Sequence, residues 1–253
     1  MPDQLILCYH AVSDHWPSPL AVTTHALERQ LASLVERGYC GVTFEQAVTA
    51  RHEGRTLAVT FDDAYRSTLT RAAPVLANLG LPGTVFAPTD FVDRSEPMSW
   101  PGIDGWSATA YADELVCLSW DQLAGLSDSG WEIGSHTRSH PRLSELDDGQ
   151  LRDELAESRR ILVDRFGRCA SLALPYGDGD RRVIFAAIRA GYSAVAGLPA
   201  PGGAELPAYP RVGVYRADGR LRFRLKAARA ARHIRASPLG RPLAAVMNRW
   251  GAR

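Results

Sequence analysis

Short apolar runs recur along the chain, and each is followed by polar, Gly-rich or Pro-rich residues and then by a helical pattern. Runs of this length between turn residues predict buried strands. They lie at residues 5–10, 57–63, 83–88, 132–136, 171–177, 193–197 and 211–215. Because strands that alternate with helices form parallel sheets with right-handed crossovers, the pattern predicts an α/β protein. Seven or so β/α units favour a closed or nearly closed barrel over an open sheet.

Two amphipathic helices are predicted between these strands, and each ends at a glycine, the residue typical of a helix C-terminus. The first, over residues 25–38, ends at Gly38 and has Leu27, Leu31, Leu34 and Val35 on one face. The second, over residues 144–167, ends at Gly167 and has Leu151, Leu155, Leu162 and Phe166 on one face.

The segment 91–119 has no clear periodicity and is rich in Gly, Pro and Trp. Such a stretch predicts a long loop over the active face of a barrel, with a part in substrate recognition. Trp100 and Trp106 are its candidates for stacking on the apolar face of a sugar. The alternative is that these rings belong to the core, where large aromatics are common.

Length and composition fit one soluble domain. The 253 residues include 45% hydrophobic and 23% charged residues, which argues against disorder. Four cysteines without CxxC spacing indicate free thiols, not a zinc ribbon or a disulfide framework. The first residues, MPDQLILCYH, lack a basic segment, and no run approaches the ~20 apolar residues of a spanning helix. A cytoplasmic location is therefore expected.

The charge distribution divides the chain into a body, residues 1–219, and a basic helical extension, residues 220–253. The extension carries ten Lys or Arg and no Asp or Glu, which leaves the body with 19 basic and 28 acidic residues. Residues 220–235 interleave apolar residues with arginine, a pattern typical of interfacial helices that approach anionic membranes. The alternative is a helix that docks on the acidic body. Nucleic-acid binding ranks last, because no nucleic-acid motif accompanies the tail.

The motif TFDDA, residues 60–64, places two aspartates directly after a predicted strand. Their side chains face different directions on an extended chain, so one can ligate a metal while the other faces a bound water. Burying both without compensation would be costly, which implies a metal or another cation nearby. The alternative is a solvated turn or a helix N-cap.

The motif GSHTRSH, residues 134–140, places His136 and His140 four residues apart after another predicted strand. At this spacing two imidazoles can converge on one ion if the chain turns between them. Two imidazoles and a carboxylate leave positions open for water and substrate, as catalytic metal sites do.

Taken in order, the motifs YHAVSD, TFDDA, WDQLAGLSDSGWEIGSHTRSHPRLSEL and LALPYG resemble the polysaccharide deacetylase family, the NodB-homology fold of carbohydrate esterases. The resemblance spans roughly residues 4–216. It implies an irregular (β/α)7-type barrel and a divalent metal, most often Zn²⁺, with Co²⁺, Ni²⁺ or Fe²⁺ as alternatives. It also implies Asp62 as general base and Asp63, His136 and His140 as metal ligands. Pro175 and Tyr176 would form a turn at the substrate, with the Tyr176 N–H at the oxyanion.

The chain departs from the family pattern at three places. Ala64 stands where the first motif usually has Gly, and Ala173-Leu174 stands where many members have an arginine that braces the base. From topology, Arg211 could brace Asp62 instead. Many members use a late histidine as general acid, whereas the only later histidine here is His233, in the basic tail. His10 is the substitute, with a purely structural role as the alternative.

These observations predict a metal-dependent hydrolase that removes N-acetyl groups from a sugar met inside the cell, on a lipid-linked, nucleotide-linked or metabolite-linked saccharide. One alternative is a hydrolase of a non-sugar amide or a cyclic imide on the same fold. Another is a barrel that binds glycans without catalysis.

Overall fold

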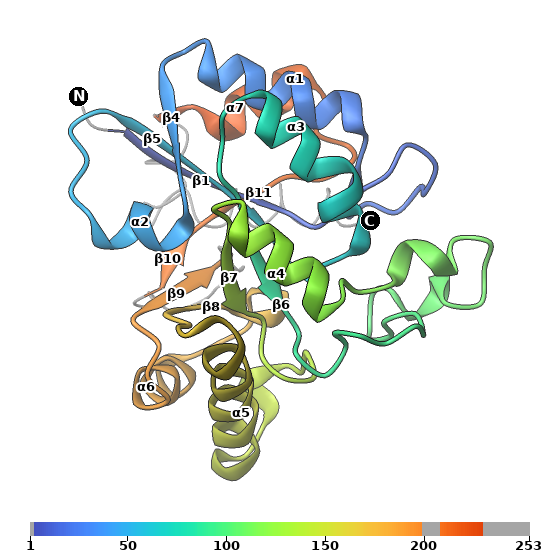
Figure 1. Cartoon of the computed structure of the whole chain (residues 1–253), viewed down its shortest axis with the longest axis vertical. Coiled ribbons are helices and arrows are strands. Elements are labelled where there is room, and N and C mark those ends of the chain that lie inside the picture. Colours follow the sequence, from blue (N-terminus) through green and yellow to red (C-terminus); the bar gives the residue numbers. More distant parts are fainter. Residues whose placement is uncertain (1–2, 199–207, 230–253) are drawn as a thin grey trace.

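The computed structural model describes residues 3–198 and 208–229. In these residues, helices surround a central sheet of parallel strands (Figure 1). The strands are β1 (Asp3–Tyr9), β2 (Ala11–Val12), β3 (Ala21–Val22), β4 (Tyr39–Val42), β5 (Arg55–Phe61), β6 (Thr84–Ala87), β7 (Glu132–Ser135), β8 (Ser171–Ala173), β9 (Ala194–Gly197), β10 (Tyr209–Pro210) and β11 (Val212–Gly213). The helices are α1 (Thr24–Val35), α2 (Phe44–Thr49), α3 (Ala73–Asn78), α4 (Trp120–Asp128), α5 (Asp148–Phe166), α6 (Arg181–Arg189) and α7 (Arg220–Ala227).

The sheet runs in the order β10-β9-β8-β7-β6-β5-β1-β11, and β4 pairs with the first half of β5. Every pairing in it is parallel, as the alternation of strands and helices predicts. The two ends of this path, β10 and β11, are neighbours in the chain with only Arg211 between them. The sheet therefore forms a nearly closed barrel, and Arg211 lies at its seam.

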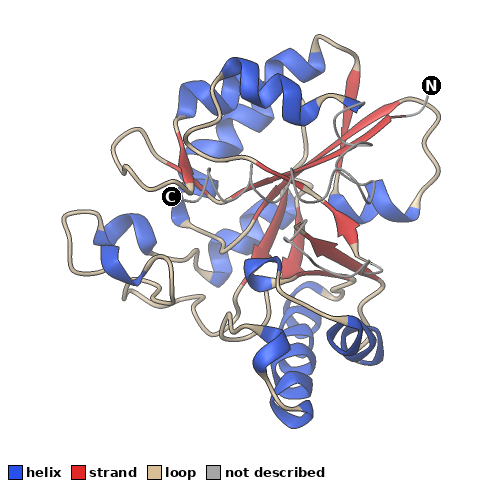
Figure 2. Cartoon of the chain, turned by 180° about the vertical axis from the view of Figure 1, so that it is seen from behind, coloured by secondary structure: helices blue, strands red, loops and turns tan. Residues whose placement is uncertain are grey.

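Alternate side chains of the strands enter two separate apolar clusters, because side chains alternate across a strand. Leu5, Leu7 and Val59 belong to the large cluster, which also contains the buried faces of α1 and α5. The smaller cluster collects side chains from the other face of the strands around Phe44 of α2, whose ring meets that of Phe86 at 5.5 Å. Seen from behind, the strands cross the centre of the molecule and the helices lie outside (Figure 2).

The predicted helix over residues 144–167 begins later than expected, at Asp148. Asp147 caps it through two reciprocal hydrogen bonds. The Asp147 side chain accepts the Gln150 N–H, and the Gln150 side-chain oxygen accepts the Asp147 N–H. Its predicted end is confirmed, since Gly167 adopts φ 74°. It packs beside α6 (Figure 1).

Other boundaries predicted from sequence are wrong by a few residues. The first helix ends at Val35, and Gly38, with φ 79°, closes the turn after it rather than capping the helix. The predicted strand 171–177 stops at Ala173, because a tight turn begins at Pro175. The short strand β4 lacks a long apolar run and is not predicted.

The basic extension begins as a helix that packs on the body. In α7, Phe223 and Lys226 are buried, and Lys226 Nζ lies 2.5 Å from Asp218 Oδ2 and 3.0 Å from the Gly213 carbonyl. The predictions for residues 230–253 lie outside the described residues. Within residues 3–198 and 208–229, no helix has the length and apolar character needed to cross a bilayer.

Candidate metal and catalytic site

The chemically active residues follow the ends of three strands. His10 comes after β1, Asp62 and Asp63 after β5, and His136 after β7. Because parallel strands end at one edge of a barrel, these side chains gather at the same face. All except His10 are buried, and His10 is half-buried.

Asp63, His136 and His140 converge on one point. The Asp63 Oδ1 atom lies 3.2 Å from His136 Nε2 and 3.3 Å from His140 Nε2. Two ligand atoms held about 2.0–2.1 Å from a tetrahedral ion are about 3.3 Å apart, so these separations suit a metal such as zinc.

Hydrogen bonding supports the same interpretation. Asp63 Oδ1 is buried yet has no hydrogen-bond partner among the described residues, although the two imidazole nitrogens are near. His136 Nδ1 lies 2.9 Å from the Ala173 carbonyl, which only accepts, so Nδ1 carries the proton. The Nε2 lone pair of His136 is therefore free for an ion, the arrangement in which a main-chain carbonyl fixes a metal-ligating imidazole. The three side chains fit a divalent metal.

The charges of the site also favour a cation. Burial would raise the pKa of Asp63, but His136 and His140 hold it well below its usual range. Burial lowers the pKa of His140, whereas the carboxylates of Asp62 and Asp63 outweigh burial at His136 and raise its pKa. Two ionised aspartates face one arginine here, which leaves negative charge for an ion to offset.

That arginine is Arg211, which lies between β10 and β11 at the seam of the barrel. Its Nη1 donates to Asp62 Oδ1 at 2.6 Å and its Nη2 donates to Asp62 Oδ2 at 2.8 Å. Burial would raise the pKa of Asp62, but the guanidinium outweighs it and lowers the pKa to about 2. The structure thus brings Arg211 against the side chain that topology suggested.

Sequence reasoning missed Cys8, whose Sγ lies 3.3 Å from Asp62 Oδ2. Cys8 pairs in register with Thr60, two residues before Asp62, so strand alternation places both side chains on the same face of the sheet. Because side chains two residues apart on a strand share a face, the predicted position of His10 at the site could have pointed to Cys8 as well.

Backbone strain concentrates at the site. Positive φ is rare for residues other than glycine and costs on the order of 1–3 kcal/mol, so it persists where the surroundings enforce it. Of the six such residues in the described parts of the chain, five lie in the three loops at the site: Asp63, Ala64, Thr137, His140 and Tyr176. At Ala64, φ is 50°, which explains why glycine suits this position in the family motif.

The turn Pro175–Gly177 lies beside His140, one of the three candidate metal ligands. The Tyr176 ring packs edge-on against His140 at 4.7 Å, and the Arg142 guanidinium lies 4.4 Å above the same ring. The N–H groups of Gly177 and Asp178 bond within the turn, whereas no main-chain partner is found for the Tyr176 N–H among the described residues. Pro175 is buried beneath. The Tyr176 N–H as an oxyanion donor stays a prediction.

His10 lies beside Asp62. One ring nitrogen of His10, the thiol of Cys8 and an Asp62 oxygen all lie within 4.8 Å of one another. The Nδ1 atom of His10 is buried and has no hydrogen-bond partner in the described part of the chain, and the ring stacks on Tyr215 at 6.4 Å. This position is compatible with proton transfer, and the role of general acid stays a prediction.

The long segment 91–119 does reach the site. Trp100 is only 8% exposed and its ring stacks on His140 at a centroid distance of 4.0 Å and an angle of 18°. Trp106 is half-buried and packs edge-on against Trp16 and Tyr111. Trp100 therefore packs against the candidate ligand His140, and contact of either ring with a sugar stays a prediction.

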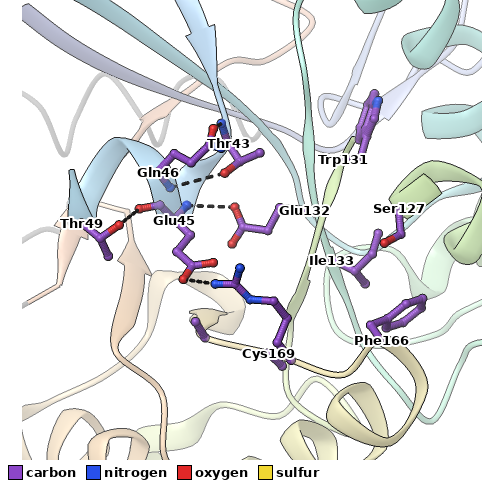
Figure 3. A pocket seen from close by; sticks show the side chains of 12 residues that line it. Thr43, Glu45, Gln46, Thr49, Ser127, Trp131, Glu132, Ile133, Phe166 and Cys169 are labelled. Atoms are coloured by element: carbon purple, nitrogen blue, oxygen red, sulfur yellow. Dashed lines mark hydrogen bonds and ion pairs between the residues drawn. The ribbon is translucent and has the colours of Figure 1, made fainter. Parts of the chain in front are cut away.

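A hollow of about 420 Å³ lies at the opposite end of the barrel strands (Figure 3). Glu132, at the start of β7, accepts the Glu45 N–H there at 2.8 Å, and Glu45 pairs with Arg168. In α/β barrels the residues at this end usually contribute to stability, since catalytic residues lie at the carboxyl ends of the strands.

Fold and site define an α/β-barrel protein with a buried carboxylate–imidazole site at its strand ends. The chain belongs to the polysaccharide deacetylase family, since the family model described as polysaccharide deacetylase matches residues 49–195. This family comprises metal-dependent hydrolases that remove acetyl groups from sugars.

Individual relatives agree with this assignment. YxkH of Bacillus subtilis (strain 168) is 24% identical over 193 residues, which cover 74% of this chain and 61% of YxkH. The poly-beta-1,6-N-acetyl-D-glucosamine N-deacetylase of Escherichia coli (strain K12) is 32% identical over 143 residues, 52% of this chain and 20% of that protein. This chain thus spans less than two thirds of either relative. The structure of IcaB from Ammonifex degensii matches with a TM-score of 0.71 at 24% identity, covering 90% of this chain and 97% of IcaB.

Proposed function

We propose that this protein is a metal-dependent hydrolase that removes N-acetyl groups from an N-acetylated saccharide. The observation that carries the proposal is the convergence of Asp63, His136 and His140 around a buried carboxylate oxygen that no group in residues 3–198 and 208–229 hydrogen-bonds. The name of the E. coli relative supports an N-acetylglucosamine unit in the substrate. Lipid-linked, nucleotide-linked and metabolite-linked saccharides remain the substrate classes to be compared.

Asp63, His136 and His140 would hold the ion. A bound divalent ion polarises the acetyl carbonyl and makes a water acidic enough to attack near neutral pH. Two imidazoles and one carboxylate suit Zn²⁺ first, and also Co²⁺, Ni²⁺ or Fe²⁺, among which availability often decides.

The chain's own residues would handle protons and charge. The Asp62 carboxylate, kept ionised by Arg211, accepts a proton from the attacking water as its oxygen bonds to the acetyl carbon. The Tyr176 N–H donates to the oxyanion, a contribution on the order of 3 kcal/mol. The C–N bond then breaks, His10 gives a proton to the leaving amine, and acetate and a free amino sugar result.

Acetate release from a substrate panel tests this proposal. The panel contains N-acetylglucosamine oligomers, lipid-linked and nucleotide-linked N-acetyl sugars, and simple amides and cyclic imides. Metal-loaded wild type would be compared with Asp62→Asn and His136→Ala, and with the exposed-site control His25→Ala. We expect release from one sugar class, lost in both site variants and retained in the control.

Other outcomes separate the alternatives. Release from amides or imides alone would indicate the non-sugar hydrolase. A protein that binds metal stoichiometrically and retains a glycan, yet releases nothing, would indicate a glycan-binding barrel. Activity that survives in both site variants would refute the proposed site.

We also propose that the outer face of α7 contacts an anionic membrane. Leu221 is 70% and Leu225 52% exposed, and Arg220 and Arg224 are exposed on the same helix. Apolar side chains beside arginines suit the boundary between acyl chains and anionic headgroups. Truncation at residue 220 would be a poor test, because it removes the buried Phe223 and Lys226.

Vesicle binding by the full chain tests the membrane proposal. The double variant Leu221→Gln/Leu225→Gln should lose binding to anionic vesicles, and wild type should not bind neutral ones. Phe185→Gln/Ile188→Gln, on the exposed face of α6, is the matched control and should bind like wild type. Equal binding by the α7 variant would refute this contact.

A further inference from the structure

A buried carboxylate on α5 faces the turn between the two histidines. Glu154 is 7% exposed, and its Oε2 accepts the N–H of Arg138 at 3.0 Å and of Ser139 at 2.8 Å. Its Oε1 accepts the Ser139 hydroxyl at 2.6 Å. Successive N–H groups directed at one anion form an anion-binding nest, and here the nest binds a side chain of the same protein.

The turn that carries His140 requires such support. Thr137 and His140 adopt φ of 66° and 61°, which is unfavourable for both and most of all for a β-branched residue. The Thr137 N–H donates to Ser135 Oγ, which in turn lies 2.8 Å from Ser158 Oγ. Ser158 is one helical turn after Glu154, so α5 supports this turn at two points.

Glu154 is also an unusual residue for its position. It interrupts the apolar buried face of α5 formed by Leu151, Leu155 and Leu162. A buried carboxylate is costly unless it is hydrogen-bonded, and packing alone would be served by an apolar residue. The three donors it receives all come from Arg138 and Ser139, directly before the ligand His140.

We propose that Glu154 is a positioning residue that holds the 137–140 turn so that His140 points at the metal. The proposal rests on the proposed metal site of Asp63, His136 and His140. Glu154 itself touches neither ion nor substrate. If its role were only to attach α5 to the barrel, its loss would lower stability and leave metal affinity unchanged.

The variants follow from the hydrogen bonds. Glu154→Ala removes the acceptor for all three donors, and we expect metal affinity to fall by about 10–100-fold, as for other residues that orient a metal ligand. Glu154→Gln can accept both N–H groups through its amide oxygen and donate its amide N–H to Ser139 Oγ, so it should retain most of the affinity. Asp153→Ala, at a side chain 67% exposed on the same helix, is the matched control.

The experiment measures metal binding by the full chain. Co²⁺ is titrated into metal-free protein and followed by its visible absorption, Zn²⁺ affinity is measured by competition with a chelator, and the thermal unfolding of metal-free protein reports stability. We expect weaker binding in Glu154→Ala alone, at temperatures where all variants are folded. If Glu154→Ala does not fold, Glu154→Asp, which retracts the same charge by one methylene, takes its place.

Two results would overturn the proposal: wild-type affinity in Glu154→Ala, or a loss in Glu154→Gln as large as in Glu154→Ala. Failure of the underlying site is distinguishable from both. In that case wild type would bind neither ion, or would bind it equally well after His136→Ala.

Discussion

Replacing Arg211 by methionine would leave the buried Asp62 carboxylate without its cation. The side chains of Arg211 and Asp62 are 0% and 3% exposed and share two hydrogen bonds, at 2.6 and 2.8 Å. Removing one partner of a buried pair costs about 3–5 kcal/mol, because the other charge stays desolvated. We therefore expect Arg211→Met to lower the free energy of unfolding by about 3–5 kcal/mol, a large part of a typical domain's 5–15 kcal/mol.

A double-mutant cycle isolates the pair from the packing of Arg211 at the seam. Asp62→Asn leaves the arginine buried without an anion, so it should also destabilise. In Asp62→Asn/Arg211→Met neither member of the pair is left as a buried charge without its partner. The double variant should therefore be more stable than the sum of the single losses predicts, by about 1–3 kcal/mol.

Urea unfolding of metal-free protein in a chelator, followed by tryptophan fluorescence and circular dichroism, supplies the four free energies. Chelation matters, because a metal bound to the folded state would add its own stabilisation. A cost below about 1 kcal/mol for Arg211→Met, or losses that add within about 0.5 kcal/mol, would refute the role assigned to this pair.

Three further predictions concern other buried groups. Burial raises the pKa of Glu132, so the fold should lose stability as pH rises from about 4.5 through that raised value; Glu132→Gln should flatten this loss in thermal unfolding, and an unchanged pH profile would contradict it. Trp100→Ala should cost about 3–5 kcal/mol in urea unfolding and weaken metal binding through His140, whereas wild-type metal affinity would show that the stacking is incidental. Asp218→Ala removes a carboxylate 2.5 Å from the buried Lys226 Nζ and should cost about 3–5 kcal/mol; a loss under 1 kcal/mol in the same assay would show that this pair does not secure α7.

The local part of the fold could be predicted from the sequence. Apolar runs locate seven strands of the barrel, and Gly167 marks the end of α5. These strands are β1, β5, β6, β7, β8, β9 and β11. Their limits shifted where a side chain or a turn competed with the pattern, as at the Asp147 cap and at Pro175. The strand β4 was missed, because its four residues are too few to form a long apolar run.

The order of residues along the chain also predicted which residues meet at the candidate site. Parallel strands end at one edge, so residues after β5 and β7 had to meet there, and the spacing of His136 and His140 suited one ion. The meeting of these residues at one edge follows from the period of a strand and the direction of the sheet, whereas their roles as metal ligands and general base came from the resemblance to the family.

Only the tertiary structure decided which distant side chains support that site. The stacking of Trp100 on His140 and the hold of Glu154 on the turn before His140 join separate segments. Topology had suggested Arg211 beside Asp62, and the structure added the bidentate geometry of that contact. Such contacts depend on how the barrel closes and on which helix face packs against it. Closure is the sum of many small packing terms spread over the whole chain, and no single stretch of sequence carries it.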